Sequence, residues 1–185
     1  MNDKFFSDYF QFIQTGVESV NQPDLIKVSD TIKAVSKAGK KLIIAGNGGS
    51  AAMASHAAVD FTKAAGIRAI NFNEADLLTC LSNDYGYERV FEKAVAFYGD
   101  EGDLLILISS SGKSTNVINA AKRAKKLNMN VITFSGFERD NPLRKLGDIS
   151  FWVDSKAYNI VEMTHHIWLL AIVDYIIGDI EYSAS

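Results

Sequence analysis

The sequence contains one cysteine, two prolines and no long uninterrupted apolar run. The single cysteine, Cys80, excludes an internal disulfide and a cysteine-based zinc cluster, so no pattern indicates an oxidising compartment. The longest apolar run, 167–173, is far shorter than the ~20 residues that span a bilayer. Residues 1–16 mix charged and amide side chains with aromatics and do not resemble a signal peptide. We therefore expect a cytoplasmic protein with no membrane partner.

The chain also carries no net positive charge. The net charge is −3 and the sequence pI is about 5.6, which argues against a nucleic-acid partner, because such proteins need a basic field. The densest basic run, 122–126, falls in the last turns of a predicted helix, where cations complement the helix dipole. No stretch rich in Gly, Ser and Pro marks a linker. The 185 residues, 48% of them hydrophobic, are therefore expected to form one domain.

Two helices are predicted before residue 39, and the apolar pattern then changes. Short continuous apolar runs alternate with amphipathic segments of helical length, which is typical of a parallel sheet covered on both faces. We predict a doubly wound, three-layer αβα sandwich with a five-stranded parallel sheet. The predicted strands are 42–45, 69–72, 104–108, 131–134 and 149–153. The predicted helices are 5–17, 22–38, 50–63, 75–97 with a break at 83–86, 116–127 and 159–177.

The last predicted helix, 159–177, is apolar on nearly every side. A helix of this kind in a soluble protein has to be buried all round. In a chain of this size part of that burial is expected to come from another subunit, as for the aromatic face of the first helix, 5–17. The pattern thus predicts a homo-oligomer.

Two loops at the carboxyl ends of predicted strands carry polar residues suited to ligand binding, and ligands of open parallel sheets bind at this edge. The first, 45–51, follows the first strand and contains three glycines that permit close approach to the backbone. The second, 109–114, holds four serines and precedes the helix 116–127. Hydroxyl groups and the free N–H groups of a helix start are what a phosphate monoester requires. The serine loop (109–114) is therefore predicted to bind phosphate.

Two other phosphate-binding motifs compete with this interpretation. The segment 112–114 ends like a nucleoside-triphosphate loop, but Leu107 stands where its first glycine is required. Gly46, Gly48 and Ala51 match dinucleotide-binding spacing, and Glu74 lies at a suitable distance to bind a ribose. This second rival stays open, although its pattern is weak and it leaves the serine loop without a role.

Together these motifs resemble those of the sugar isomerase (SIS) domains, and among them the phosphoheptose (sedoheptulose-7-phosphate) isomerases. The resemblance extends over nearly the whole chain. It rests on the segments 46–50, 83–86 and 108–114, with His56 after the first of them and Glu162 in the last helix.

The resemblance implies a flavodoxin-like SIS domain over residues 1–185. It further implies a homotetramer with active sites between subunits, to which the helices of 1–38 contribute. In the family the serine loop holds the phosphate, and the first loop and an Asn-Asp pair contact the sugar. The implied substrate-binding residues are Asn47, Gly48, Ser50, Asp84, Ser109, Ser110, Ser111 and Ser114.

Phosphoheptose isomerases carry a His and a Glu one helical turn apart after the glycine loop, and a Gln and a His two turns apart on the last helix; these four can hold zinc. The first pair corresponds here to His56 and Asp60. The second pair aligns with Val161 and Leu169, which can neither bind a metal nor transfer a proton. His165 lies one turn from each of these two positions and is expected to fill the missing role.

The implied chemistry is interconversion of an aldose and a ketose phosphate. The candidate catalytic residues are Asp60 as base, His165 as acid, and Glu162, which would pair with His166. The pattern requires no cofactor; zinc is the one candidate, with His56, Asp60 and His165 as ligands. Two alternatives stay open: both histidines of the last helix serve structure only, and the chain is a non-catalytic phosphosugar-binding or protein-interaction SIS protein, similar to the initiator-associating relatives.

Overall fold

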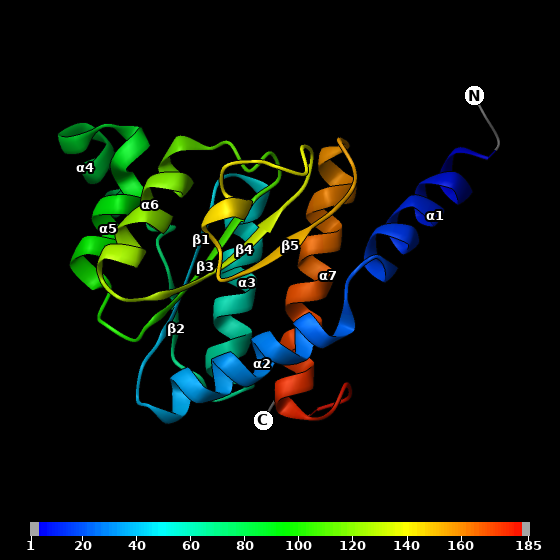
Figure 1. Cartoon of the computed structure of the whole chain (residues 1–185), viewed down its shortest axis with the longest axis horizontal. Helices are drawn as coiled ribbons and strands as arrows, with labels where there is room; N and C mark the ends of the chain where they lie inside the picture. Colours follow the sequence, from blue (N-terminus) through cyan, green and yellow to red (C-terminus); the bar gives the residue numbers. More distant parts are fainter. Residues whose placement is uncertain (1–3, 183–185) are drawn as a thin grey trace.

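The computed structural model describes residues 4–182 and contains a five-stranded, all-parallel sheet in the order β2-β1-β3-β4-β5 (Figure 1). The strands are β1 (Leu42–Gly46), β2 (Ala69–Asn71), β3 (Leu104–Ser109), β4 (Asn130–Ser135) and β5 (Ile149–Trp152). All five lie where apolar runs predicted them. This strand order confirms the doubly wound, flavodoxin-like prediction.

Helices cover both faces of the sheet, as predicted. They are α1 (Phe5–Glu18), α2 (Gln22–Lys37), α3 (Gly49–Lys63), α4 (Ala75–Tyr85), α5 (Val90–Tyr98), α6 (Thr115–Lys126) and α7 (Tyr158–Ile177), with short 3₁₀ turns η1 (Tyr87–Arg89) and η2 (Arg144–Leu146). The predicted break inside 75–97 is real. Gly86, with a φ of +82°, ends α4, and the chain restarts through η1 into α5.

The core consists of two apolar layers separated by the sheet, because alternate side chains of each strand point to opposite faces. In β1, Leu42 and Ile44 join the layer formed with α2, α3 and α7. Their neighbours Ile43 and Ala45 join the layer formed with α4, α5 and α6. Since every residue of β1 is buried, this strand reads as a continuous apolar run rather than an alternating one.

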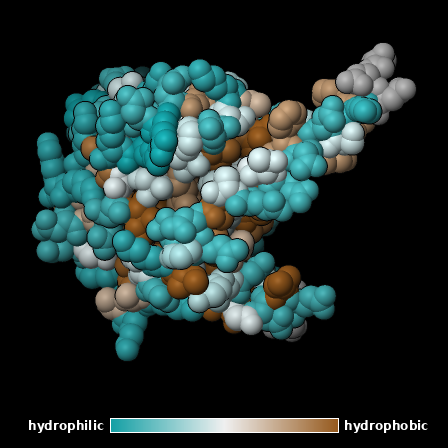
Figure 2. All heavy atoms as spheres, turned by 45° about the vertical axis from the view of Figure 1, so that its right-hand side comes forward, coloured by the Kyte–Doolittle hydropathy of each residue, from teal (hydrophilic) through white to brown (hydrophobic). Residues whose placement is uncertain are grey.

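Helix α1 projects from the body of the domain (Figure 1). Gly16 is its one buried residue within the described chain, and it packs against α7, where an added Cβ would lie 2.6 Å from Oγ1 of Thr164. The Trp168 indole N–H donates a 2.8 Å hydrogen bond to the carbonyl of Val17. Four phenylalanines of α1 are 59–70% exposed: Phe5, Phe6, Phe10 and Phe12. Figure 2 shows brown and tan apolar patches along the projecting helix.

Helix α7 is long and apolar enough to cross a membrane by length and composition alone. Its side chains Trp168, Leu169 and Ile172 lie in the core, and it packs against α1, α2 and α3. The burial of these residues identifies α7 as a core helix. Met163 and Ile167 stay 40% and 42% exposed, so the single chain does not bury this helix all round.

Candidate functional site

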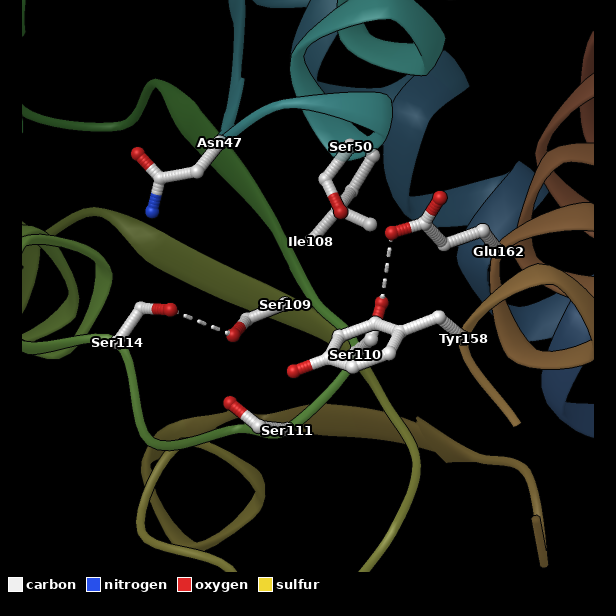
Figure 3. Close-up of a pocket in the computed structure, with 9 residues that line it drawn as sticks. All are labelled: Asn47, Ser50, Ile108, Ser109, Ser110, Ser111, Ser114, Tyr158 and Glu162. Atoms are coloured by element: carbon white, nitrogen blue, oxygen red, sulfur yellow. Dashed lines mark hydrogen bonds between the residues drawn. The ribbon is translucent and has the colours of Figure 1, made fainter. Parts of the chain in front are cut away.

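The serine loop and the first glycine loop lie side by side at the point where the strand order reverses. β1 and β3 are adjacent, with Gly46 paired to Ile108, so the loops that follow them diverge from neighbouring positions. Between them is a cavity of about 120 Å³ (Figure 3). Its lining residues are Asn47, Ser50, Ile108, Ser109, Ser110, Ser111, Ser114, Tyr158 and Glu162. This is smaller than the roughly 300–1,000 Å³ of pockets that enclose a whole drug-sized ligand, and it suits one end of a ligand.

The start of α6 lies at one end of this cavity, because its N-cap residue Ser114 is part of the lining. One N–H of the first turn, that of Val117, donates to Asn116 Oδ1 at 3.0 Å. Ser114 makes no side-chain capping hydrogen bond, and the first turn carries no acidic residue. Ser114 instead accepts a 3.2 Å hydrogen bond from the Ser109 hydroxyl. Because the first N–H groups of a helix lack partners within it and carry partial positive charge, this end of the cavity favours an anion.

The first loop contributes an amide network to the opposite wall. The side chains of Asn47 and Asn116 exchange hydrogen bonds of 3.0 and 2.9 Å, and the Tyr87 hydroxyl donates to Asn47 Oδ1 at 2.7 Å. Gly48 has a φ of +54°, which only glycine adopts readily; it shapes the loop but is not among the lining residues. Asn47 is thus held in place by side chains from α6 and η1.

Glu162 reaches the cavity from α7 and lies against the N-terminal end of α3. Its Oε1 accepts a 3.2 Å hydrogen bond from the Ser110 hydroxyl (Figure 3). A Cβ added at Gly49, in the first turn of α3, would lie 2.3 Å from its Oε2. A carboxylate at a helix N-terminus is stabilised by the dipole. Glu162 therefore connects α3, α7 and the serine loop, and it pairs with Ser110 rather than with His166 as the sequence predicted.

His56 and Asp60 lie further along α3 and do not line the cavity. His56 Nε2 is 3.2 Å from Asp60 Oδ2, and His56 Nδ1 is 2.9 Å from Nε2 of His166 on α7. Burial and the neighbouring His56 lower the pKa of His166, while Asp60 opposes that shift. The result is a row of one carboxylate and two imidazoles in contact, with the His56 side chain 49% exposed.

His165 is not beside His56 and Asp60, which corrects the prediction for it. The residue is 1% exposed, and its Nε2 lies 2.9 Å from the carbonyl oxygen of Ser135. Burial lowers its pKa to about 4, against a smaller opposing effect of that hydrogen bond. The helical spacing placed His165 near Val161 and Leu169 correctly, but those residues face the core. His165 is therefore buried away from the cavity.

The predicted zinc ligand set does not fit the structure. Only two of its members, His56 and Asp60, come together, and residues 4–182 contain no group of three or more His, Cys, Asp and Glu side chains placed to hold a metal. The third predicted ligand, His165, is buried in the core, where its Nε2 is bonded to the Ser135 carbonyl and its Nδ1 has no hydrogen-bond partner in the described chain.

Asp84 also lies outside the lining of the cavity, at the C-terminal end of α4, where it accepts a hydrogen bond from Asn83. Glu74, on which the dinucleotide interpretation depended, is the exposed N-cap residue of α4 and does not line the cavity either. Sequence reasoning did not identify Tyr87 and Tyr158. No motif contains them. They come near the two loops only because the fold brings η1 and the start of α7 next to them.

Comparisons with known proteins agree with this geometry. The sequence model of the SIS domain matches residues 5–136, and the chain belongs to the SIS domain family. Within that family it belongs with the phosphoheptose isomerases. It is 38% identical over 169 residues to the phosphoheptose isomerase of Aliarcobacter butzleri, covering 88% of each chain. It is 33% identical over 180 residues to that of Helicobacter pylori, covering 94% of this chain and 92% of the relative.

Solved structures show the same similarity. The phosphoheptose isomerase of Neisseria gonorrhoeae superposes with a TM-score of 0.84 at 29% identity, covering 92% of this chain and 94% of the other. That of Francisella tularensis gives a TM-score of 0.86 at 27% identity, covering 95% and 97%.

Proposed function

We propose that this protein is a sugar-phosphate isomerase that interconverts an aldose and a ketose phosphate. The observation that carries the proposal is the cavity where the serine loop meets the start of α6. Four serine hydroxyls and the positive end of the α6 dipole form a cradle suited to a phosphate monoester. The relatives at 33–38% identity named phosphoheptose isomerase support the reaction type and the substrate class. We place the reaction in the cytoplasm, where an exposed free thiol such as Cys80 stays reduced.

The proposed reaction removes a proton from the carbon next to the carbonyl of the open-chain sugar, giving an ene-diolate, and returns a proton to the neighbouring carbon. We assign Asp60 as the base, with His56 holding it by their 3.2 Å contact. Glu162 orients the serine loop through Ser110. His165 leaves the catalytic set because it is buried, and no step is routed through zinc because its three predicted ligands do not meet.

We further propose a homotetramer in which the site is completed between subunits. Asp60 and His56 do not line the cavity of their own chain, but His56 is half-exposed and free to face a neighbour. The phenylalanines of α1 form an apolar surface with no partner in the described chain, and such surfaces mark interfaces between proteins. The apolar α1 surface is therefore proposed to bind a second copy.

Light scattering should give a mass four times that of the 20.3 kDa chain. Phe10→Glu places a charge on the α1 surface and is expected to yield smaller species. Phe97→Glu on α5 is the matched control, since Phe97 is 61% exposed against 64% for Phe10, and it should stay tetrameric. A wild-type protein that is monomeric at micromolar concentration contradicts the proposal.

Isomerase activity is tested by incubating the protein with sedoheptulose 7-phosphate and with pentose and hexose phosphates, with and without added zinc. At least one should be converted. Asp60→Asn is expected to lower kcat by ~100-fold or more, the usual size of a general-base contribution, while phosphosugar binding is retained. A Ser110→Ala, Ser114→Ala double variant, purified identically, should lose binding and thereby controls for contaminating isomerase. Conversion of no sugar under either condition would contradict the isomerase proposal.

A second candidate function is favoured by one observation. Val161 and Leu169, which stand where the resemblance places a Gln and a His, are 0% and 1% exposed in the core and can supply no acid, base or metal ligand. A chain that retained the phosphate cradle without turnover would be a phosphosugar-binding protein. Thermal stabilisation by a sugar phosphate, without conversion in the assay above, is the result that distinguishes this function.

A further inference from the structure

One wall of the cavity differs from the rest. The lining is mostly small and polar, but Tyr158, the first residue of α7, presents an aromatic ring that is 60% exposed. Figure 3 shows this ring beside the serine loop, with its hydroxyl directed toward the side on which Ser109 and Ser111 lie. A ring with this exposure at the mouth of a polar cavity leaves an apolar surface open to a ligand.

The Tyr158 ring is held in position by a strained residue. Phe137 contacts it edge-on, with ring centroids 4.9 Å apart and planes at 71°. Phe137 has a φ of +56°, a region in which a bulky residue is a genuine outlier. The backbone is held there by a 3.0 Å hydrogen bond from the Phe137 N–H to the carbonyl of Ser155. Strain of this kind persists where the surrounding structure imposes it, and it is concentrated at functional sites.

The same turn is also tied to the serine loop. The N–H of Gly136, one residue before Phe137, donates a 2.9 Å hydrogen bond to the carbonyl of Ser110. Gly136 has no room for a side chain, since a Cβ there would lie 2.7 Å from Val161. The segment 136–137 therefore sets the distance between the phosphate cradle and the Tyr158 ring. The Tyr158 ring and the serine loop therefore line the same cavity at a fixed separation.

We infer that Tyr158 is a specificity-determining residue whose ring packs against the C–H face of the sugar carbons next to the phosphate. The inference rests on the proposed function and deepens it. The substrate class becomes phosphorylated sugars that present an apolar C–H face close to a terminal phosphate. Inorganic phosphate, which has no carbon chain, gains nothing from the ring. Phe137 is the positioning residue that keeps the ring over the cavity.

The test compares dissociation constants for sedoheptulose 7-phosphate and inorganic phosphate, measured by calorimetry on the full chain. Tyr158→Ala is expected to weaken sugar-phosphate binding about ten-fold, the upper range for a packed aromatic contact, and to leave inorganic phosphate binding unchanged. Tyr158→Phe keeps the ring and should bind both ligands like the wild type. Phe137→Gly relieves the backbone strain but leaves the Tyr158 ring unsupported, and it should weaken only sugar-phosphate binding.

Unchanged sugar-phosphate binding in Tyr158→Ala overturns the inference about Tyr158 but leaves the proposed function standing. Equal weakening of both ligands also overturns it, because Tyr158 would then act on the phosphate cradle rather than on the sugar. If the wild type binds inorganic phosphate but no sugar phosphate of the panel, the proposed function fails and the inference fails with it. The ratio of the two dissociation constants therefore separates the two failures.

Discussion

Replacing Gly112 by alanine is expected to weaken phosphosugar binding by at least ten-fold. Gly112 lies in the serine loop with a φ of +62°, and a Cβ there would lie 2.0 Å from Oδ1 of Asn141. Asn141 cannot move aside easily, since it is 1% exposed. Its amide donates to Ser135 Oγ at 3.0 Å and its Oδ1 accepts from the Arg144 N–H at 2.9 Å. The loop has to shift instead, and the serine hydroxyls move with it.

Calorimetric titration with sugar phosphate and urea unfolding measure the two effects of Gly112→Ala. The backbone strain alone should cost about 1–3 kcal/mol of unfolding free energy. Gly66→Ala is the matched control, because Gly66 has a φ of +66° with no atom within 4 Å of the added Cβ. It should lose stability from strain but keep its affinity. Wild-type affinity in Gly112→Ala would show that the loop conformation does not hold the ligand.

His165 is expected to make the protein acid-sensitive. Its pKa is about 4 in the folded protein and ordinarily near 6.5. Above pH 6.5 the imidazole is therefore neutral in both the folded and the unfolded protein, and burying it has no proton-linked cost. As the pH falls from about 6.5 to 4, the unfolded chain binds a proton that the folded protein does not, and stability falls. At ~1.4 kcal/mol per pKa unit, the loss is on the order of 3 kcal/mol. Urea unfolding between pH 7 and pH 4 measures it.

His165→Gln retains an amide donor for the carbonyl of Ser135 but does not titrate, so it should flatten this part of the pH dependence. Its isomerase kcat at neutral pH should be unchanged, because a buried structural residue does not touch the substrate. His166→Gln is the comparison. The pKa of His166 is also lowered, but the ring is only partly buried. His166→Gln should therefore reduce the pH dependence of the unfolding free energy less than His165→Gln does. An unaltered slope in His165→Gln contradicts the structural role.

The fold was largely predictable because each element carries its own local signal. β3 is a run of six buried residues, which no amphipathic helix matches, and Gly86 marks the break between α4 and η1. The two loops could be located for the same reason. Ligands of doubly wound sheets bind at the carboxyl ends of the strands. Because β1 and β3 are parallel neighbours, the serines after β3 and the glycines after β1 lie close together.

The side chains that come from α7 were harder to predict. This helix is apolar nearly all round, so helical spacing shows which residues share a face but not which face is buried. His165 was accordingly predicted at the site and lies in the core, whereas Glu162 does reach the cavity. The contact of His56 with His166 joins residues 110 positions apart, and no local pattern encodes it.

By itself the sequence determined the layer architecture and the places of the two loops, because apolar periodicity and glycine placement act over a few consecutive residues. Only the tertiary structure decided that His165 is neutral and buried, that Glu162 faces Ser110, and that Tyr158 forms a wall of the cavity. Those outcomes depend on how α7 is rotated against the sheet. That rotation is set by packing with α1, α2 and α3, a property of the whole core rather than of any one segment.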